Sequence, residues 1–212
     1  MIDYSLYLVT NRDLSCGRST VEVVEAAVAG GVSCVQLREK HCSTREFITQ
    51  ARALKPFLKS KNIPLIINDR LDVALAVEAD GLHLGQQDMT ISDARKISGT
   101  SLIIGISAES VDDAIRAEKE GADYIGISPV FATPTKSDTA PPLGLEGVKT
   151  IRKMIAIPIV AIGGINRHNA LSVITAGADG IAVVSAIVGA KNPKDAAFEL
   201  KSIVRQAAVS AP

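Results

Sequence analysis

The sequence predicts an α/β protein built as a single (β/α)8 barrel, and three observations lead to this prediction. Eight short apolar runs alternate with amphipathic segments along the 212 residues. A glycine-containing joint recurs where several amphipathic segments meet the next apolar run. No G-x-G-x-x-G motif follows the first run, which disfavours the main alternative, an open doubly wound sheet. One such (β/α)8, or TIM, barrel over residues 1–212 lies near the lower end of the length range of this fold.

The apolar runs are rich in Val, Ile and Leu and are almost continuous. This composition is typical of strands that are covered on both faces in a parallel sheet. In chain order the expected strands are Leu6–Val9, Cys34–Leu37, Pro64–Ile67, Gly81–Leu84, Leu102–Ile106, Tyr124–Ile127, Pro158–Ile162 and Gly180–Val184.

The segments between the runs are expected to be helices, and some carry start signals. Ser19 is expected to cap a helix that ends at Ala29, and Ser43 one that ends at Leu58. Ser110 precedes two aspartates, whose charge complements a helix N-terminus. In four joints a glycine is expected to supply the positive φ that ends the helix: Ala29 to Gly31, Glu78 to Gly81, Glu120 to Asp123, and Ala176 to Asp179.

The composition narrows the range of partners. The 23 basic and 23 acidic residues balance, which argues against nucleic acid or an anionic membrane held by bulk charge. Three cysteines without CxxC spacing favour a reducing compartment, and no apolar run reaches the ~20 residues of a membrane span. We therefore expect a cytoplasmic protein that acts on small molecules, with a homo-oligomer left open.

The segment Ala132–Gly144 holds three prolines and is longer than an ordinary loop after a barrel strand. A lid over the barrel mouth is the functional interpretation, and a plain surface loop is the alternative.

A cationic group follows the second strand. Strand side chains alternate, so Gln36, Arg38 and Lys40 are expected on the face that points into the barrel, while Leu37 packs under helices. A bound phosphate or diphosphate explains buried cations there, because arginine suits fork-like contact with phosphate oxygens. The alternative is a structural ion pair with Glu39 or a neighbouring strand.

Two carboxylates are expected at the same rim. Asn68 and Asp69 end the third strand, and Asp88 lies in the loop after the fourth. Mg²⁺, which takes one or two carboxylates plus substrate phosphates, would reconcile them with a bound anion. The alternative is that each acid caps the helix that follows it.

The remaining strand ends complete the mouth. Ser107 ends strand five, and Thr133, Thr135 and Lys136 lie in the long segment. The glycine pair ending at Gly164 follows strand seven and Val184-Ser185 follows strand eight, the usual phosphate site of such barrels. The histidines are expected elsewhere: His83 is interpreted as a satisfied core residue, and His41 and His168 as surface residues.

Taken together, these motifs resemble the thiamine-phosphate synthase family from about Tyr4 to the last helix. The matching motifs are Gln36 to Lys40, Asn68-Asp69, His83 to Gln86 with Asp88, Thr133 to Lys136, Ala161 to Ile165 and Val184 to Ala186. The resemblance implies that a hydroxymethylpyrimidine diphosphate condenses with a thiazole phosphate, giving thiamine phosphate and diphosphate.

The resemblance also implies a role for each matching residue. The pyrimidine diphosphate would be held by Gln36, Leu37, Arg38, Glu39, Lys40, Asn68, Ser107 and Lys136, and Mg²⁺ by Asp69 and Asp88. The thiazole phosphate would be held by Thr133, Pro134, Thr135, Gly164, Val184 and Ser185. Arg38, Lys40 and Lys136 would stabilise the leaving group as catalytic cations.

The sequence departs from the family pattern at two positions. Glu109 stands where many members have a histidine, and Ser128 where they have a glycine. The nearest rival is a thiazole tautomerase of the same descent, which depends on that histidine, so Glu109 counts against it. A non-catalytic thiamine-precursor binding protein is a second rival, disfavoured by the retained Arg38, Asp69 and Asp88.

Overall fold

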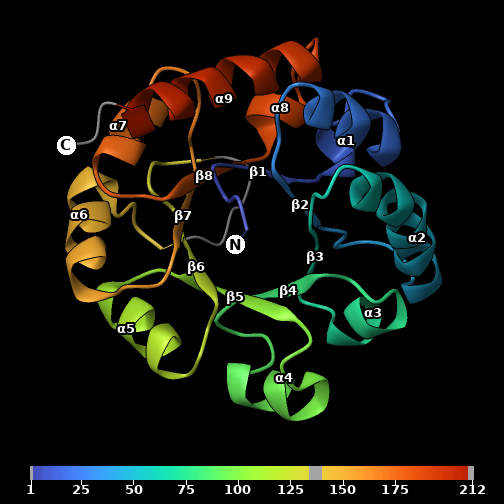
Figure 1. Ribbon diagram of the computed structural model, residues 1–212, viewed down its shortest axis with the longest axis horizontal. Coiled ribbons are helices and arrows are strands. Elements are labelled where there is room, and N and C mark those ends of the chain that lie inside the picture. Colours follow the sequence, from blue (N-terminus) through green and yellow to red (C-terminus); the bar gives the residue numbers. More distant parts are fainter. Residues whose placement is uncertain (1, 134–139, 210–212) are drawn as a thin grey trace.

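The computed structural model describes residues 2–133 and 140–209. Its eight strands form a closed parallel barrel in which consecutive strands are neighbours and β8 pairs with β1. Figure 1 looks along this barrel, with the strands in the centre and the helices in an outer ring. The predicted (β/α)8 barrel is confirmed.

The strands lie close to the predicted apolar runs. They are β1 Leu6–Val9, β2 Cys34–Leu37, β3 Leu65–Asn68, β4 Gly81–Leu84, β5 Ile103–Ala108, β6 Tyr124–Ile127, β7 Ile159–Ile162 and β8 Gly180–Val183. The bounds match the prediction for β1, β2, β4 and β6 and differ by at most two residues at an end for the others.

The helices begin where the capping residues predict. Ser19 and Ser43 each form a reciprocal capping box with a glutamate three residues on, and the Ser110 side chain accepts from the Asp113 N–H. The helices are α1 Thr20–Ala29, α2 Thr44–Ser60, α3 Leu71–Ala76, α4 Ile91–Ser98, α5 Val111–Lys119, α6 Gly144–Met154, α7 Ala170–Thr175, α8 Ser185–Val188 and α9 Pro193–Val209, with a 3-10 turn η1 at Arg12–Leu14. Among the described helices, none is long and apolar enough to cross a membrane.

Three of the four glycine joints behave as predicted. Gly31, Gly121 and Gly177 have φ of 105°, 87° and 109°. The expectation for Gly81 is wrong, because Glu78 takes the left-handed position with φ 50° and Gly81 lies inside β4. Close packing requires glycine at position 81, since a Cβ there would lie 2.7 Å from the Ile103 carbonyl oxygen.

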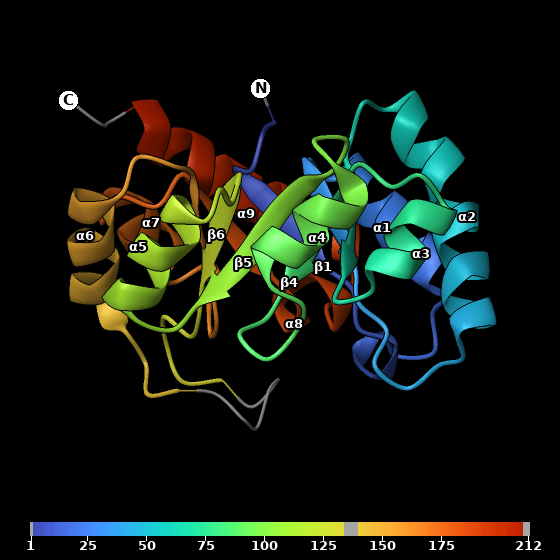
Figure 2. The same cartoon turned by 90° about the horizontal axis from the view of Figure 1, so that it is seen from below.

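Two apolar layers hold the barrel. The larger lies between the strands and the helices and includes Leu37, Leu65 and Phe47. The smaller fills the barrel interior and includes Tyr4, Tyr7 and Tyr124. Figure 2 shows the residues that precede β1 and the C-terminal end of α9 at one end of the barrel and α8 at the other, where the strands finish. The barrel interior is therefore filled by aromatic rings towards the N-terminal ends of the strands and is open at their C-terminal ends.

Candidate active site

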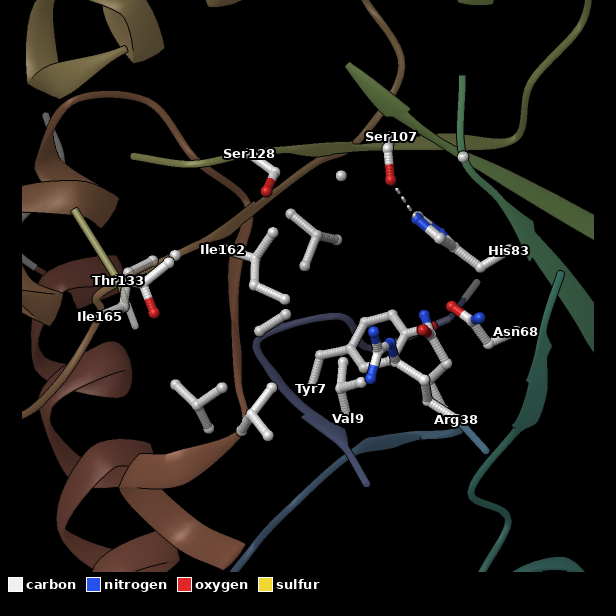
Figure 3. Close-up of a pocket in the computed structure, with 18 of the residues that line it drawn as sticks. Tyr7, Val9, Arg38, Asn68, His83, Ser107, Ser128, Thr133, Ile162 and Ile165 are labelled. Atoms are coloured by element: carbon white, nitrogen blue, oxygen red, sulfur yellow. Dashed lines mark hydrogen bonds between the residues drawn. The ribbon is translucent and has the colours of Figure 1, made fainter. Parts of the chain in front are cut away.

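A cavity of about 520 Å³ opens at the C-terminal ends of the strands. All eight strands, or the loops after them, contribute to its wall. Figure 3 shows that the wall has two characters, with Arg38, Asn68, His83 and Ser107 on one side and Ile162 and Ile165 on the other. The polar side comes from β2 to β5 and the apolar side from β7 and its loop.

The strand-two motif divides as alternation requires. Gln36, Arg38 and Lys40 line the cavity. Leu37 is fully buried in the layer beneath the helices, and Glu39 lies outside the cavity wall with its carboxylate 3.8 Å from the Arg12 guanidinium. Any contact from these two residues to a ligand would therefore have to come from their backbone.

Arg38 is held in place through its main chain. Its backbone N–H donates to the Thr10 hydroxyl at 3.0 Å, and Thr10 is itself buried beside β1. The Arg38 side chain remains partly exposed towards the cavity. An arginine with a fixed backbone and an accessible guanidinium can make paired contacts with a phosphate group.

Asp69 and Asp88 meet at the rim beside Lys40. The Lys40 Nζ lies 2.5 Å from an Asp69 oxygen. Asp88 accepts from the Gly85 N–H at 2.7 Å. Burial, followed by contact with the Asp69 carboxyl, raises the pKa of Asp88, while the Gly85 N–H acts in the opposite direction. Burial and the neighbouring Asp69 carboxyl thus both disfavour the ionised form of Asp88, and a bound cation would favour it.

The paired acids fit a divalent cation. Mg²⁺ is commonly held by one or two carboxylates together with substrate phosphates. Within residues 2–133 and 140–209, no cluster of three or more His, Cys, Asp or Glu side chains could hold a metal alone. A cation at Asp69 and Asp88 would therefore complete its coordination with water or with oxygens of the bound substrate.

A chain of hydrogen bonds forms the floor of the cavity. Gln36 Nε2 donates to the Tyr7 hydroxyl at 3.0 Å, and the Tyr7 and Tyr124 hydroxyls lie 2.9 Å apart. His83 joins Tyr124 at 3.0 Å through Nδ1 and Ser107 at 3.1 Å through Nε2. Figure 3 shows the His83–Ser107 bond on the polar side of the cavity.

His83 has a hydrogen-bond partner at each ring nitrogen, in agreement with the prediction of a satisfied histidine. It also lines the cavity. Burial lowers its pKa to about 4. The ring is therefore neutral near pH 7 and is already committed to two partners. His41 and His168 are exposed, as expected.

The opposite side of the mouth is built from backbone and small groups. Thr133, Gly164, Val184 and Ser185 line the cavity, as the sequence predicts. Helix α8 begins at Ser185 directly after β8, and the first N–H groups of a helix have no partner within it. This half of the mouth offers an anion N–H groups and hydroxyls in place of cations.

Some predicted residues lie outside the described residues. These are Pro134, Thr135 and Lys136, together with the central part of the Ala132–Gly144 segment. Of the predicted residues that are described, the cavity gathers all except Leu37 and Glu39.

Sequence reasoning missed Tyr7, Val9 and Tyr124, which also line the cavity. A signal was present for Tyr124, because Gly105 pairs with it on the neighbouring strand β5 and leaves space for a large ring. Tyr7 and Val9 share a strand face by alternation, but that face cannot be oriented from β1 alone.

Comparison with known proteins gives a consistent result. The model of the family described as "Thiamine monophosphate synthase" matches residues 6–187. A thiamine-phosphate synthase from Chloroflexus aurantiacus is 52% identical over 204 residues, covering 96% of this chain and 94% of the relative. One from Clostridium novyi is 55% identical over 187 residues, covering 88% and 92%.

The structural similarity is equally extensive. A solved thiamine phosphate pyrophosphorylase from Pyrococcus furiosus superposes with a TM-score of 0.90 at 42% identity, covering 97% of each chain. A 3-hexulose-6-phosphate synthase, at 17% identity and a TM-score of 0.72, shares the fold. The family match spans most of the chain and includes the strand ends that form the cavity, so the chain belongs to the thiamine monophosphate synthase family.

Proposed function

We propose that this chain joins 4-amino-2-methyl-5-hydroxymethylpyrimidine diphosphate to a thiazole phosphate, producing thiamine phosphate and diphosphate. The observation that carries the proposal is the division of one cavity into two anion-suited halves. Arg38, Lys40 and the carboxylate pair lie on one half, and Gly164, Val184 and Ser185 lie on the other. Two phosphorylated substrates can then meet between the halves.

The pyrimidine diphosphate is assigned to the first half. Arg38 and Lys40 contact its diphosphate, and Gln36, Asn68 and Ser107 contact the remainder. Lys136 is assigned here from the family resemblance alone, since it lies outside the described residues. The thiazole phosphate is assigned to the second half, with Thr133, Gly164, Val184 and Ser185 as its contacts and Pro134 and Thr135 added from the resemblance.

The reaction needs one bond broken and one bond formed. The bond between the pyrimidine methylene carbon and the diphosphate oxygen breaks, and the oxygen leaves with the electron pair. The thiazole nitrogen then donates its lone pair to the resulting cation and forms the new carbon–nitrogen bond. No proton has to be removed, which agrees with the floor histidine being neutral and bonded at both nitrogens.

The chain assists by stabilising charge and aligning the partners. Arg38 and Lys40 would neutralise negative charge that grows on the diphosphate. Mg²⁺, held by Asp69 and Asp88, would supply further positive charge to the same oxygens. The walls hold the two rings in one cavity, which converts an encounter in solution into a reaction between neighbours.

The cellular compartment and the class of partner are proposed from the composition. Balanced charge and an odd number of cysteines support small-molecule metabolism in the cytoplasm, without nucleic acid or membrane partners. These features also leave the chain free to act as a monomer or a homo-oligomer.

The test is an assay with both substrates and Mg²⁺, following thiamine phosphate and diphosphate together. The proposal requires equal amounts of both products. Conversion of the thiazole phosphate alone, without the pyrimidine substrate, would instead identify a tautomerase. Tight binding of either substrate without any product would identify a binding protein.

A further inference from the structure

The hydrogen-bonded floor of the cavity connects five strands. It runs from Gln36 on β2 through Tyr7 on β1 and Tyr124 on β6 to His83 on β4 and Ser107 on β5. Each link is 2.9–3.1 Å long. All five residues line the cavity, but the two end residues each have one bond within the chain of bonds, whereas the central members are bonded on both sides.

The direction of the whole chain follows from the orientation of the Gln36 amide, whose nitrogen faces Tyr7. Gln36 Nε2 can only donate, so in this orientation the Tyr7 oxygen accepts from it. Tyr7 has one hydroxyl proton, and the Tyr124 oxygen is its strong acceptor. The Cys34 thiol also contacts Tyr7, but sulfur is a weak acceptor and its S–H can donate instead.

The direction continues to the far end. The Tyr124 proton is then donated to His83 Nδ1, which must be the unprotonated nitrogen of a neutral ring. The ring proton therefore lies on Nε2 and is donated to the Ser107 oxygen. The Ser107 hydroxyl proton has no acceptor within the chain of bonds and is directed to the cavity.

At the Gln36 end, the side chain presents an acceptor to the cavity instead of a donor. Since Gln36 Nε2 is committed to Tyr7, the amide oxygen is the part of this side chain left for a ligand. Among the hydrogen bonds of the described residues, none involves that oxygen. Every fully buried side-chain oxygen of these residues has a partner, so the Gln36 oxygen is not fully buried. The Gln36 oxygen is thus an accessible acceptor in the cavity.

We propose that Tyr7, Tyr124 and His83 are positioning residues that fix Gln36 as an acceptor and Ser107 as a donor towards a bound amino-heterocycle. A ring with an exocyclic N–H donor and a ring-nitrogen acceptor matches this pattern. An oxo-heterocycle, which replaces the amino donor with an acceptor oxygen, does not. The assignment of the ligand as an aminopyrimidine rests on the proposed function, whereas the direction of the relay does not.

The barrel leaves space for this relay. A Cβ on Gly105 would lie 2.1 Å from Cζ of Tyr124, so only glycine at this position admits the end of the ring. Tyr4 packs against Tyr124 with ring centroids 4.8 Å apart and the ring planes tilted by 33°, which further restrains the ring. The Tyr124 hydroxyl is therefore held between Tyr7 and His83.

Reversal of every bond is the competing arrangement. Ser107 would then donate to His83 Nε2, the ring proton would lie on Nδ1, and Gln36 would present its amino group to the cavity. This arrangement also satisfies each member, and it selects the opposite ligand pattern. The two arrangements differ in one observable, the nitrogen of His83 that carries the proton.

The first test is nitrogen NMR of the histidine rings at neutral pH. The chain has three histidines, and His41 and His168 are exposed, so the His83 signals can be assigned by their absence in His83→Gln. We expect a proton on Nε2 in the wild-type protein and a changed tautomer population in Tyr124→Phe. A proton on Nδ1 in the wild type would overturn the proposed polarity. This measurement needs no substrate and stands even if the proposed reaction fails.

The second test compares affinity for the aminopyrimidine diphosphate and for its 4-oxo analogue, without the thiazole phosphate. Wild type is expected to prefer the amino compound by roughly tenfold or more, because the oxo compound leaves a buried polar group unpaired. Tyr124→Phe should lose most of this preference. Tyr4→Phe, which removes the neighbouring hydroxyl, should keep both the preference and the His83 signal. If Tyr124→Phe does not fold, Tyr7→Phe breaks the relay one step earlier, and an unchanged preference in the folded variant would refute the positioning role.

Discussion

The carboxyl groups of Asp69, after β3, and Asp88, in the loop after β4, both line the cavity rim, and the Asp69 carboxyl acts to raise the pKa of Asp88. Such closeness is unfavourable for two anions. Lys40 pairs directly with Asp69 and also acts to lower the pKa of Asp88, but the pKa of Asp88 remains raised. A divalent cation would stabilise both anions.

The first prediction is therefore that activity depends on the metal and on this pair. EDTA should abolish product formation, and Mg²⁺ should restore it. Asp69→Ala should lower kcat/KM at least ~100-fold, the typical loss for one charge-stabilising contact. Asp112→Asn, an exposed acid on α5, is the matched control and should remain active. Full activity of Asp69→Ala would remove the metal role assigned to it.

The second prediction concerns stability without metal. Because the pKa of Asp88 is raised in the folded protein, folding favours its protonated form, and this contribution is lost as pH rises through the folded pKa. Asp88→Asn should therefore raise the melting temperature of the metal-free protein at pH 7. The gain should disappear below about pH 4, where the wild-type carboxyl is protonated in both states. A gain that is independent of pH would point to a cause other than charge.

The third prediction separates the charge of Arg38 from its shape. Arg38→Ala should lower kcat/KM at least ~100-fold, whereas Arg38→Lys should retain the charge and recover part of that loss. Arg45→Ala removes an exposed cation from α2 and should have no effect. Steady-state kinetics with varied pyrimidine diphosphate make the comparison. Equal loss in the Ala and Lys variants would show that paired contact geometry, rather than charge, is what matters.

Much of the polar side of the site was predictable, because strand alternation is a local rule. Gln36, Arg38 and Lys40 reach the cavity through the same period of two that removes Leu37 and Glu39 from it. The resemblance assigned all five residues as one motif, and the alternation separates them.

The floor of the cavity was not predictable in the same way. The bond between Tyr7 and Tyr124 joins residues 117 positions apart, and it depends on how the two strands are turned in the closed barrel. The prediction for the joint before β4 was wrong because Glu78, a residue other than glycine, takes the positive φ, while Gly81 is required inside β4 by the closeness of the Ile103 carbonyl oxygen. Local patterns specify elements, whereas the interior contacts need the complete barrel.

The fourth prediction follows from the buried ring of His83. Its pKa of about 4 lies below the ordinary value of 6.5, so the unfolded chain binds the proton first as pH falls. Stability that is present above pH 6.5 should be lost by up to about 3 kcal/mol towards pH 4. His83→Gln should start less stable at pH 7, because it loses two hydrogen bonds, and its deficit should narrow with acid. Thermal melts over this range test it, with His168→Gln as the exposed control, and a constant deficit would contradict it.

The last prediction compares two glycines that share a positive φ. Gly164 has φ 63° and Gly99 has φ 61°, so alanine at either site is strained, and at Gly99 the ψ of −138° lies outside the left-handed helical region and adds to the strain. A Cβ at Gly99 meets nothing within 4 Å, whereas at Gly164 it lies 2.7 Å from the Ala132 carbonyl oxygen and 2.8 Å from Phe131 Cβ.

Only Gly164→Ala should therefore disturb the mouth. Overpacking should add ~1–3 kcal/mol to its loss of stability, and displacement of the adjoining loop should raise the KM for thiazole phosphate roughly tenfold. The KM for the pyrimidine diphosphate should change much less, because its half of the cavity lies on other strands. Gly99→Ala should lower the melting temperature without altering either KM. Equal kinetic effects of the two substitutions would show that backbone strain alone, rather than the shape of the mouth at Gly164, accounts for the result.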